Sequence, residues 1–404
     1  MTRGAIVIVG GGHAGVQLCA ALVEAGQGAR VHLVCDEPLL PYQRPPLSKA
    51  FLRNPHETLQ EHRSAGWFAE HGIGVRRGDA AQAIDRARQV VRLASGTELP
   101  YAWLVLATGA RARRPPSLPP TLANVAVLRS AADAAALREQ LASTRRLSVL
   151  GGGFIGLEVA ATARALGLEV EVLESLPRLL ARSVSPELAE HVRAVHAAAG
   201  IELRLGARVG EFEIEGDRLV ALQVDGERRP VERLVLGIGA APETHLAHDA
   251  GLVVDNGVEV DANLRTSDPS ILAIGDCASF RTHDGRRLRL ESVQNANDQA
   301  RTAAATLQGR DEPYRALPWF WSEQGSLRLQ MAGLVPAAGE RHRRAGPNPA
   351  SFSIGHWDAD GRLACVESVN APLDHVMSRK LLEAGRSPTP AQFADPALAL
   401  KTLL

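Results

Sequence analysis

The chain has 404 residues, of which 45% are hydrophobic, 22% charged and 4% aromatic, a composition typical of globular proteins rather than disordered or fibrous ones. Its 45 basic residues balance its 45 acidic residues, so the formal charge is zero, which argues against a protein that binds nucleic acid through bulk charge. No stretch approaches the ~18 consecutive apolar residues of a membrane helix and the first residues resemble no secretory signal, so we expect two or three domains of a cytoplasmic protein without a membrane segment.

The first predicted elements form a unit that is repeated later in the chain. Each copy has a short apolar strand, a glycine-rich turn, an amphipathic helix and a second strand, which is the β-α-β unit that binds dinucleotides. In the first copy these are residues 5–9, the turn with Gly10, Gly12 and Gly15, residues 16–24 and residues 30–35. In the second copy they are residues 147–150, the turn with Gly151, Gly153 and Gly156, residues 157–166 and residues 169–173. One G-x-G-x-x-G pattern is weak evidence, but two copies in this context predict two dinucleotide sites, against the alternative of one site and a repeat without a ligand.

The three glycines of each turn have separate physical roles. The first permits the tight turn, the second leaves room for a pyrophosphate, and the third lets the helix pack closely on the strand. The helix N-terminus then presents free N–H groups and a positive dipole to the diphosphate.

An acidic residue at the end of the second strand of such a unit selects the dinucleotide. In the second copy this residue is Glu174, whose carboxylate can accept from a ribose 2′-hydroxyl and repels a 2′-phosphate, which favours NADH over NADPH. The alternative is a solvated charge at a strand end. In the first copy Cys35 falls at that position with Asp36 and Glu37 just beyond it, and we favour Asp36 as the ribose acceptor.

Further along the chain, Ser185 is predicted to cap a helix that ends at Gly200. Strands follow, with Asp225 and Gly226 forming a hairpin turn between two of them. These strands are expected at residues 201–205, 219–224 and 234–237.

The last third of the chain changes in character. An apolar strand at residues 271–274 leads into Gly275 and Asp276. From about residue 318, short strands with tryptophans and a last helix indicate a third, smaller α+β domain.

The four cysteines form no pair with the spacing of a zinc ribbon or a redox dithiol. Cys19 lies in an apolar run, where a small buried side chain is the better interpretation. This pattern is typical of a protein in a reducing compartment.

In combination, these motifs resemble those of a known family, and the resemblance covers essentially the whole chain. The chain resembles the two-dinucleotide flavoprotein reductases and, more closely, the FAD-dependent NADH:ferredoxin reductases of the rubredoxin- and putidaredoxin-reductase type. The motifs that carry it are residues 10–15, 44–49, 106–109, 151–156 followed by Glu158, Thr266 through Gly275-Asp276, 291–296, 319–322 and 395–397.

The resemblance implies an α/β fold with two Rossmann-like domains of the glutathione-reductase type and a small C-terminal α+β domain. It divides the chain into an FAD domain at residues 1–110 and 241–318, an inserted NADH domain at 111–240 and an interface domain at 319–404. It implies hydride transfer from NADH to FAD, then two single-electron transfers to a small iron–sulfur protein, a two-iron ferredoxin that feeds a monooxygenase or dioxygenase. No metal site is expected in the chain itself.

The same resemblance assigns catalytic roles to three charged residues. Lys49 brings a compact ammonium to the reactive edge of the flavin, where it stabilises the anionic reduced ring. Glu158, expected in the first turn of its helix, pairs with Lys49 and, with Glu291, lines the nicotinamide pocket. The alternative for Lys49 and Glu158 is an ordinary charge at a helix start. Hydride transfer needs no general base, and none is evident.

Other residues are expected to contact the cofactors. Asp276 resembles the acid that accepts from ribityl hydroxyls, and Arg44 brings positive charge to the flavin loop. Trp319 and Trp321 either form an aromatic wall at the flavin or belong to the core of the small domain. Backbone or side-chain contacts are also implied at His13, Ala14, Ala81, Thr108, Gly109, Arg129, Phe154, Ile155, Gly239 and Val293. His13 is expected to pack or to cap the backbone rather than to act in catalysis.

The expected partner is a small ferredoxin, and the protein itself is expected to be a monomer or a weak homodimer. Because iron–sulfur ferredoxins are usually acidic, a basic docking face is expected near the flavin edge. Candidates for it are Arg111, Arg113, Arg114, Arg286, Arg287, Arg289, Arg341, Arg343 and Arg344. Family members commonly carry an aromatic residue where this chain has Gly325, which leaves the identity of the partner open.

Three other functions compete with ferredoxin reduction. One is rubredoxin reduction by the same chemistry. Another is a disulfide or peroxide reductase, which would need a redox-active cysteine near the flavin, and residues 41–49 contain none. The third is an NADH flavoprotein similar to apoptosis-inducing factor.

Overall fold

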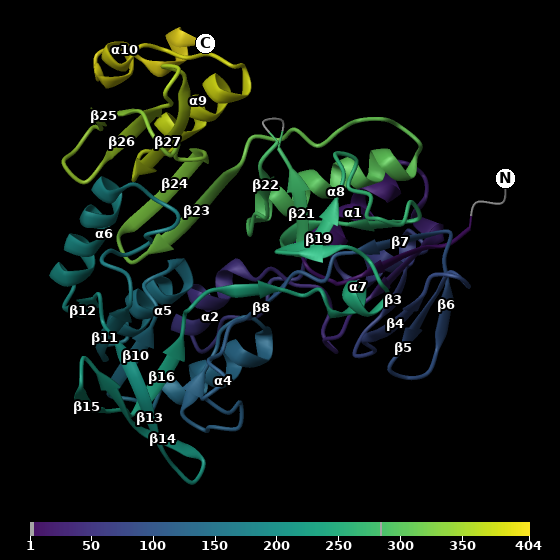
Figure 1. Cartoon of the computed structure of the whole chain (residues 1–404), viewed down its shortest axis with the longest axis horizontal. Helices are drawn as coiled ribbons and strands as arrows, with labels where there is room; N and C mark the ends of the chain where they lie inside the picture. The colour runs from purple at the N-terminus through teal and green to yellow at the C-terminus, as the bar shows by residue number, and fades with distance from the viewer. Residues whose placement is uncertain (1–3, 283–284) are drawn as a thin grey trace. The chain divides into compact units, whose positions relative to one another are not determined.

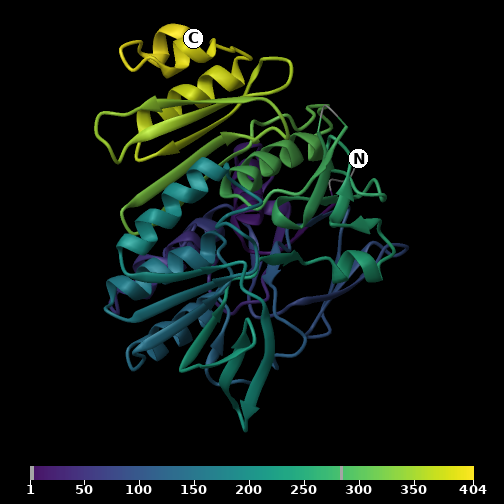
Figure 2. The ribbon, with the colours of Figure 1, turned by 60° about the vertical axis from the view of Figure 1, so that its left-hand side comes forward.

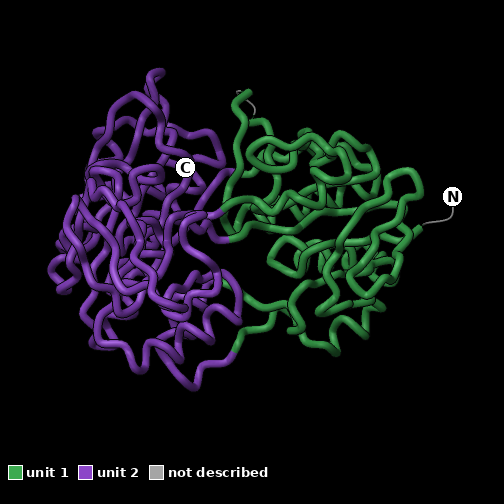
Figure 3. Tube along the Cα trace, turned by 60° about the horizontal axis from the view of Figure 1, so that its bottom comes forward, with its two compact units in different colours: residues 1–44, 59–111, 241–316 green, residues 45–58, 112–240, 317–404 purple. Residues whose placement is uncertain are grey.

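The computed structural model describes residues 4–282 and 285–404, which fold into two compact units (Figure 3). Unit 1 contains the N-terminal segment up to Arg44, Leu59–Arg111 and Ala241–Ala316. Unit 2 contains Pro45–Thr58, Ala112–Ala240 and Leu317–Leu404. Within the described residues, no helix combines the length and the apolar character that a bilayer crossing requires.

A five-stranded parallel sheet forms the centre of unit 1. Most of its strands are short apolar runs, and β1 (Ile6–Val9) is buried along its whole length, as expected where both faces of a parallel sheet are covered. Helices α1 (His13–Glu24) and α8 (Val293–Leu307) pack side by side in this unit (Figure 1). In spatial order the strands are β20 (Ile271–Ala273), β7 (Trp103–Leu106), β1 (Ile6–Val9), β2 (Val31–Val34) and β3 (Gly74–Arg76).

Two smaller sheets and several short helices complete unit 1. The first sheet joins β4 (Ala81–Asp85), β5 (Val90–Leu93) and β6 (Glu98–Pro100). The second joins β18 (Val254–Asp255), β19 (Gly257–Val260), β21 (Ala278–Arg281) and β22 (Arg287–Leu288). The short helices are η1 (Gly28–Arg30), α3 (Ala65–Glu70), α7 (His245–Asp249) and η3 (Gly275–Cys277).

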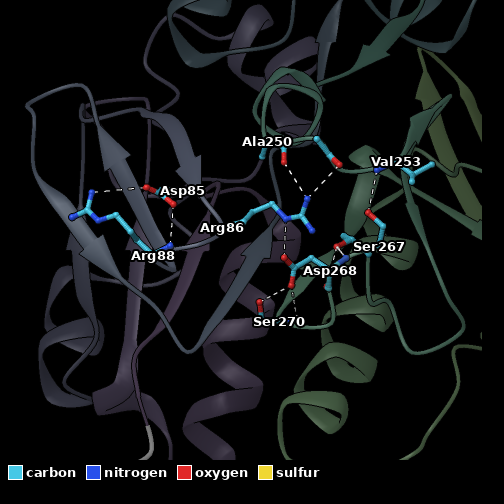
Figure 4. Close-up of polar contacts among 10 residues, drawn as sticks. Asp85, Arg86, Arg88, Ala250, Val253, Ser267, Asp268 and Ser270 are labelled. Atoms are coloured by element: carbon cyan, nitrogen blue, oxygen red, sulfur yellow. Dashed lines mark hydrogen bonds and ion pairs between the residues drawn. The ribbon is translucent and has the colours of Figure 1, made fainter.

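Arg86 ties the end of β4 to the rest of unit 1. Its guanidinium donates to a carboxylate oxygen of Asp268 at 2.8 Å and to the carbonyls of Ala250 and Gly251 beyond α7 (Figure 4). Asp268 in turn accepts from the Ser270 hydroxyl at 2.7 Å. The Arg86 side chain therefore links the end of β4 to residues 250–251 and to Asp268.

A second five-stranded parallel sheet lies in unit 2. Its spatial order is β12 (Ile201–Leu205), β11 (Glu169–Glu174), β10 (Arg146–Leu150), β16 (Arg233–Leu236) and β9 (Val125–Ala126). Helix α5 (Phe154–Ala165) follows β10 through the second glycine-rich turn, and α6 (Pro186–Ala198) is capped by the Ser185 hydroxyl as predicted. The same unit holds η2 (Pro45–Ser48), α2 (Ala50–Arg53) and α4 (Ala131–Leu141).

A three-stranded antiparallel sheet in unit 2 differs from the prediction. It consists of β13 (Val209–Glu215), β14 (Arg218–Val224) and β15 (Glu227–Pro230), of which only β14 was expected. The Asp225–Gly226 turn, with both residues at positive φ, joins β14 to β15. The predicted strand at 234–237 is β16 of the parallel sheet, so it is not the partner of β14 in this hairpin. Strands β8 (Ala110–Ala112) and β17 (Ala240–Pro242) lie where the chain passes between the units.

The C-terminal residues of unit 2 form the expected α+β fold around an antiparallel sheet. Helices α9 (Pro372–Glu383) and α10 (Pro390–Ala394), with η4 (Leu400–Leu403), lie on one face of it (Figure 2). In spatial order its strands are β23 (Trp319–Gln324), β24 (Leu327–Gly333), β27 (Leu363–Val369), β26 (Phe352–Trp357) and β25 (Glu340–Ala345).

A buried carboxylate on the opposite face of this sheet connects it to α6. Glu367 is fully buried, and one of its oxygens accepts from the backbone N–H of Ser185 at 2.8 Å. The other oxygen lies 2.9 Å from Nε2 of the buried His356. The buried polar cluster of Ser185, His356 and Glu367 therefore joins the C-terminal sheet to the start of α6.

Candidate functional site

The first glycine-rich turn has the geometry that a diphosphate requires. Gly10 has φ +117°, and a Cβ there would overlap the Ala107 carbonyl. A Cβ at Gly12 would meet nothing within 4 Å, so open space lies beside this glycine at the start of α1. The N-cap residue of this helix is Gly12, which has no side chain to cap it, so the helix start presents backbone to the open space beside the turn.

The second turn repeats this geometry in unit 2. Gly151 has φ +110°, and the nearest neighbour of a Cβ at Gly153 would be the Gly237 carbonyl oxygen at 3.7 Å. The N-cap of α5 is Gly153, which likewise has no side chain to cap the helix. Glu174 lies at the end of β11, where one carboxylate oxygen accepts from Gly152 N–H at 2.7 Å and the other from Leu176 N–H at 2.8 Å. A carboxylate has room for further donors, so Glu174 both holds the turn and offers an acceptor beside it.

The acidic residues after β2 lie in different surroundings. Glu37 is bound by the Arg44 guanidinium at 2.9 Å and by the Tyr42 hydroxyl at 2.6 Å. Asp36 is exposed and accepts from the backbone N–H of Glu37. Of the two carboxylates, Asp36 therefore keeps more acceptor capacity for a ribose.

Lys49 and Glu158 form the ion pair that the resemblance implies. The Lys49 ammonium lies 2.7 Å from a Glu158 carboxylate oxygen, and Glu158 is 4% exposed against 21% for Lys49. Glu158 is the fifth residue of α5, whose first turn contains no acidic residue, so the placement of Glu158 in the first turn was wrong. At the fifth residue of a helix the dipole contributes little. The Glu158 carboxylate is therefore stabilised by its direct partners.

Two of those partners were missed from the sequence. The Ser48 hydroxyl donates to the same Glu158 oxygen as Lys49 at 2.5 Å, and the Ser322 hydroxyl donates to the other oxygen at 2.7 Å. Both serines lie inside motifs that carry the family resemblance, residues 44–49 and 319–322, and their position there was the signal that could have indicated them.

Glu291 and Asp276 belong to unit 1. Glu291 is 38% exposed and pairs with the Arg289 guanidinium at 2.7 Å, while Arg289 also donates to the Asp276 carbonyl. Asp276 is half-buried in η3, which follows the carboxyl end of β20.

The remaining predicted contacts are distributed over both units. In unit 1, the Thr108 hydroxyl donates to the Glu243 carbonyl, and Gly109 has φ +71°. The other predicted contacts of unit 1 are His13 and Ala14 at the start of α1, Ala81 at the start of β4 and Val293 at the start of α8. Those of unit 2 are Arg129 just before α4, Phe154 and Ile155 at the start of α5, and Gly239 with φ +98°.

The two tryptophans of β23 are partly exposed, and they contact other side chains. Trp319 and Trp321 stack at 5.6 Å between ring centroids, and the Arg379 guanidinium lies 4.4 Å from the centre of the Trp319 ring. Both tryptophans are half-buried on the face of the sheet that α9 covers. Gly325, at φ +61°, opens the tight turn between β23 and β24, where a left-handed backbone favours glycine.

His13 packs as expected, against a histidine that the sequence did not reveal. The rings of His13 and His62 meet edge to face at 4.4 Å. Burial, followed by the nearby His13, lowers the pKa of His62 to about 3. His62 is therefore neutral at physiological pH.

Several arginines predicted for a docking face are engaged elsewhere. Arg344 is 6% exposed and donates to the carbonyls of Phe393, Asp395 and Leu398, so its assignment to a docking face was wrong. It closes the C-terminal helices onto the sheet. Arg111, Arg287 and Arg289 are ion-paired within unit 1, with Glu243, Glu259 and Glu291 respectively.

All four cysteines are free and buried. Burial, and then the charges of Asp36 and Glu37, raise the pKa of Cys35 to about 12. The reactive species of a thiol is the thiolate, so Cys35 is unsuited to redox catalysis.

Comparisons with known proteins agree with this geometry. Residues 4–300 match the family described as pyridine nucleotide-disulphide oxidoreductase, and residues 319–404 match a reductase C-terminal family. Rhodocoxin reductase of Rhodococcus erythropolis is 43% identical over 98% of this chain and 93% of its own length. The crystal structure of a ferredoxin reductase for the CYP199A2 system from Rhodopseudomonas palustris has a TM-score of 0.94 at 43% identity, covering 98% of this chain and 99% of that one. A putidaredoxin reductase, solved in covalent complex with putidaredoxin, has a TM-score of 0.94 at 36% identity, covering 100% and 98%.

Proposed function

The chain belongs to the pyridine nucleotide-disulphide oxidoreductase family, and we propose that it is an FAD-containing reductase that passes electrons from NADH to a small two-iron ferredoxin of an oxygenase system. The observation that carries this proposal is the pair of open glycine-rich turns, one in each unit, each followed by a helix without a side-chain cap. Two such turns serve two dinucleotides.

We assign the FAD diphosphate to the glycine-rich turn of unit 1 and NADH to the region of residues 111–240. The open space beside Gly12 accepts the FAD diphosphate, with Asp36 toward the ribose and Asp276 toward the ribityl chain. Gly153 and Glu174 bind the corresponding parts of NADH, and the negative charge of Glu174 opposes a 2′-phosphate. Residues 319–404 form the interface domain in this assignment.

When bound, FAD supplies the chemistry that links a two-electron donor to a one-electron acceptor. In the proposed mechanism the protein's own residues bind, orient and stabilise charge. Lys49 would supply positive charge to the flavin when it is bound, and Glu158 holds the Lys49 ammonium in place at 2.7 Å. No side chain has to remove a proton from a reacting atom, because the hydrogen moves as hydride.

The proposed partner follows from the relatives. Rhodocoxin reductase and the putidaredoxin reductase of the covalent complex are both named for small redox proteins, and a 40% identical relative is a rubredoxin–NAD(+) reductase of Pseudomonas putida. We therefore propose a ferredoxin as the acceptor and treat rubredoxin as the alternative that the experiment distinguishes.

The test starts from the purified protein. It should carry a flavin absorbance that NADH bleaches under anaerobic conditions, and it should then reduce a two-iron ferredoxin faster than a rubredoxin. If the partner docks through charge, reduction of the ferredoxin should slow as salt rises while reduction of ferricyanide should not. A colourless protein that takes up no added FAD would refute the proposal, and faster turnover with rubredoxin would change the partner.

A further inference from the structure

The carboxylate of Glu158 is the inner end of a continuous hydrogen-bond chain in unit 2. One of its oxygens receives the Lys49 ammonium at 2.7 Å and the Ser48 hydroxyl at 2.5 Å. Its other oxygen receives only the Ser322 hydroxyl, at 2.7 Å, among the described residues. Because Glu158 is 4% exposed, these donors replace the water that would otherwise solvate its charge.

The chain continues outward from Ser322 through two more buried side chains. The Gln324 amide donates to the Ser322 oxygen at 3.1 Å, and Nε2 of His196 lies 2.9 Å from the Gln324 carbonyl oxygen. Ser322, Gln324 and His196 are each 2% exposed or less. We name this group, His196, Gln324, Ser322 and Glu158, the carboxylate chain.

The order of donors and acceptors gives the carboxylate chain a direction. Ser322 has one hydroxyl hydrogen, which it donates to Glu158. The Gln324 amide N–H must therefore be the donor in the hydrogen bond between Gln324 and Ser322. The amide carbonyl of Gln324 then faces His196, which must present Nε2–H. Burial lowers the pKa of His196, so the ring is neutral and this tautomer is fixed by its partner. Every hydrogen in the chain therefore points toward Glu158.

The two outer members of the carboxylate chain, Gln324 and His196, are linked to Lys49 through Ser322 and Glu158. His196 and Gln324 line a surface hollow of about 450 Å³ together with residues of α5 and the β23–β24 turn. Among the described residues their side-chain hydrogen bonds lead to Ser322 and not to Lys49, so we expect any effect they have on chemistry to pass through Ser322 and Glu158.

We propose that Ser322, Gln324 and His196 are positioning residues, which hold the Glu158 carboxylate in one orientation so that Lys49 keeps one fixed position. This inference rests on the proposed function for its catalytic consequence, but not for its structural one. Ser322 divides the partners of Glu158 between its two oxygens, and without it the carboxylate is free to rotate away from the Ser48 and Lys49 side. The Trp-Ser-x-Gln stretch at 321–324 thereby acquires a role beyond packing.

The first experiment observes Lys49 directly. The chain has three lysines, so protein made with [6-¹³C]lysine gives three ε-methylene signals, and the exposed Lys380 and Lys401 serve as internal references. Ser322→Ala should shift the Lys49 signal toward those of the two exposed lysines and leave theirs unchanged. Ser322→Thr, which keeps the hydroxyl, should restore the wild-type signal.

The second experiment measures hydride transfer from NADH by stopped flow at saturating NADH. Ser322→Ala should slow it roughly tenfold, equivalent to about 1.4 kcal/mol, with little change in the NADH concentration for half-saturation. Gln324→Glu is isosteric but cannot donate to Ser322, so it should slow the reaction in the same way. Ser368→Ala is the matched control, because Ser368 is equally buried in the same sheet and pairs with Ser353 on the other face.

Two results would overturn the inference. One is a Lys49 signal and a hydride-transfer rate that stay within the range of the Ser368→Ala control in both Ser322→Ala and Gln324→Glu. The other is a Ser322→Thr variant as impaired as Ser322→Ala, which would point to packing rather than to the hydroxyl. The Lys49→Gln variant separates the positioning inference from the proposed function. A full hydride-transfer rate in Lys49→Gln would refute the catalytic role of Lys49. The lysine signals of the Ser322 and Gln324 variants would still decide whether these residues position Lys49.

Discussion

In the proposed function a preference for NADH would depend on the carboxylate of Glu174, and the structure indicates how to remove that charge without damaging the turn. Glu174→Ala would leave the N–H of the buried Gly152 without a partner, which costs about 1–3 kcal/mol and would confuse specificity with folding. Glu174→Gln keeps an oxygen for that N–H and removes the negative charge. It is therefore the sharper perturbation.

The magnitude follows from Coulomb's law. A carboxylate about 5 Å from a phosphate charge, at an effective dielectric between ~20 and ~80 for this half-buried side chain, is repelled by about 1–3 kcal/mol. That range corresponds to roughly a 5- to 150-fold discrimination against NADPH. Glu174→Gln should lose most of this factor, chiefly through a higher kcat/KM for NADPH.

The assay compares kcat/KM for NADH and NADPH at fixed ionic strength with ferricyanide as acceptor. Glu169→Gln is the matched control, because Glu169 is exposed at the opposite end of β11, and it should leave the ratio unchanged. A ratio of NADH to NADPH efficiency that is the same in Glu174→Gln and wild type would refute the assignment of Glu174 to the ribose.

Three further perturbations test other parts of the structure. Cys35→Ser should keep NADH-dependent turnover within about twofold of wild type, because a buried, protonated thiol does no redox work; a large loss in the steady-state assay would revive that role. Tyr101→Phe should improve resistance to alkaline unfolding: burial, then Asp268, raises the pKa of Tyr101 to about 12, so the stability contributed by the neutral phenol is complete below about pH 10 and lost as the pH rises through about 12. Circular dichroism across that range measures the effect, and identical curves for the two proteins would contradict it. Arg86→Ala should cost about 1 kcal/mol at neutral pH, as for a half-exposed ion pair with added hydrogen bonds. Burial alone would raise the pKa of Asp268, but the hydrogen bonds from Arg86 and Ser270 lower it overall, so the penalty should shrink as the pH falls below about 4. Urea unfolding at two pH values measures it, and an equal penalty at both would be the contrary result.

The duplicated dinucleotide-binding units could be predicted because their signals are local. An apolar run, glycines at fixed spacing and an amphipathic helix all fall within about thirty residues, and the observed β1, α1, β10 and α5 follow them closely. Strand β15 escaped prediction because three of its four residues are charged, so it lacks the alternation of a half-buried strand. Strand β13 does alternate, with Phe212 and Ile214 between glutamates, and that signal was missed.

The environment of Glu158 could not be predicted in the same way. Its partners Ser48 and Ser322 lie 110 and 164 residues away along the chain, and a serine carries no signal that reveals which buried charge it serves. Arg344 shows the converse error. Within an arginine-rich segment its charge resembles that of its exposed neighbours, and only the position of β25 against the C-terminal helices turns it into a buried donor.

The buried Glu367 limits how this architecture can be recombined. A chimaera that joined residues 1–318 of this chain to the last domain of a relative would have to supply an acceptor for the Ser185 N–H and a matching histidine at the same depth. Without both, the chimaera would bury either the Ser185 N–H without an acceptor or the carboxylate without its histidine partner. Partner specificity is therefore better altered by exchanging exposed side chains than by swapping the entire C-terminal module.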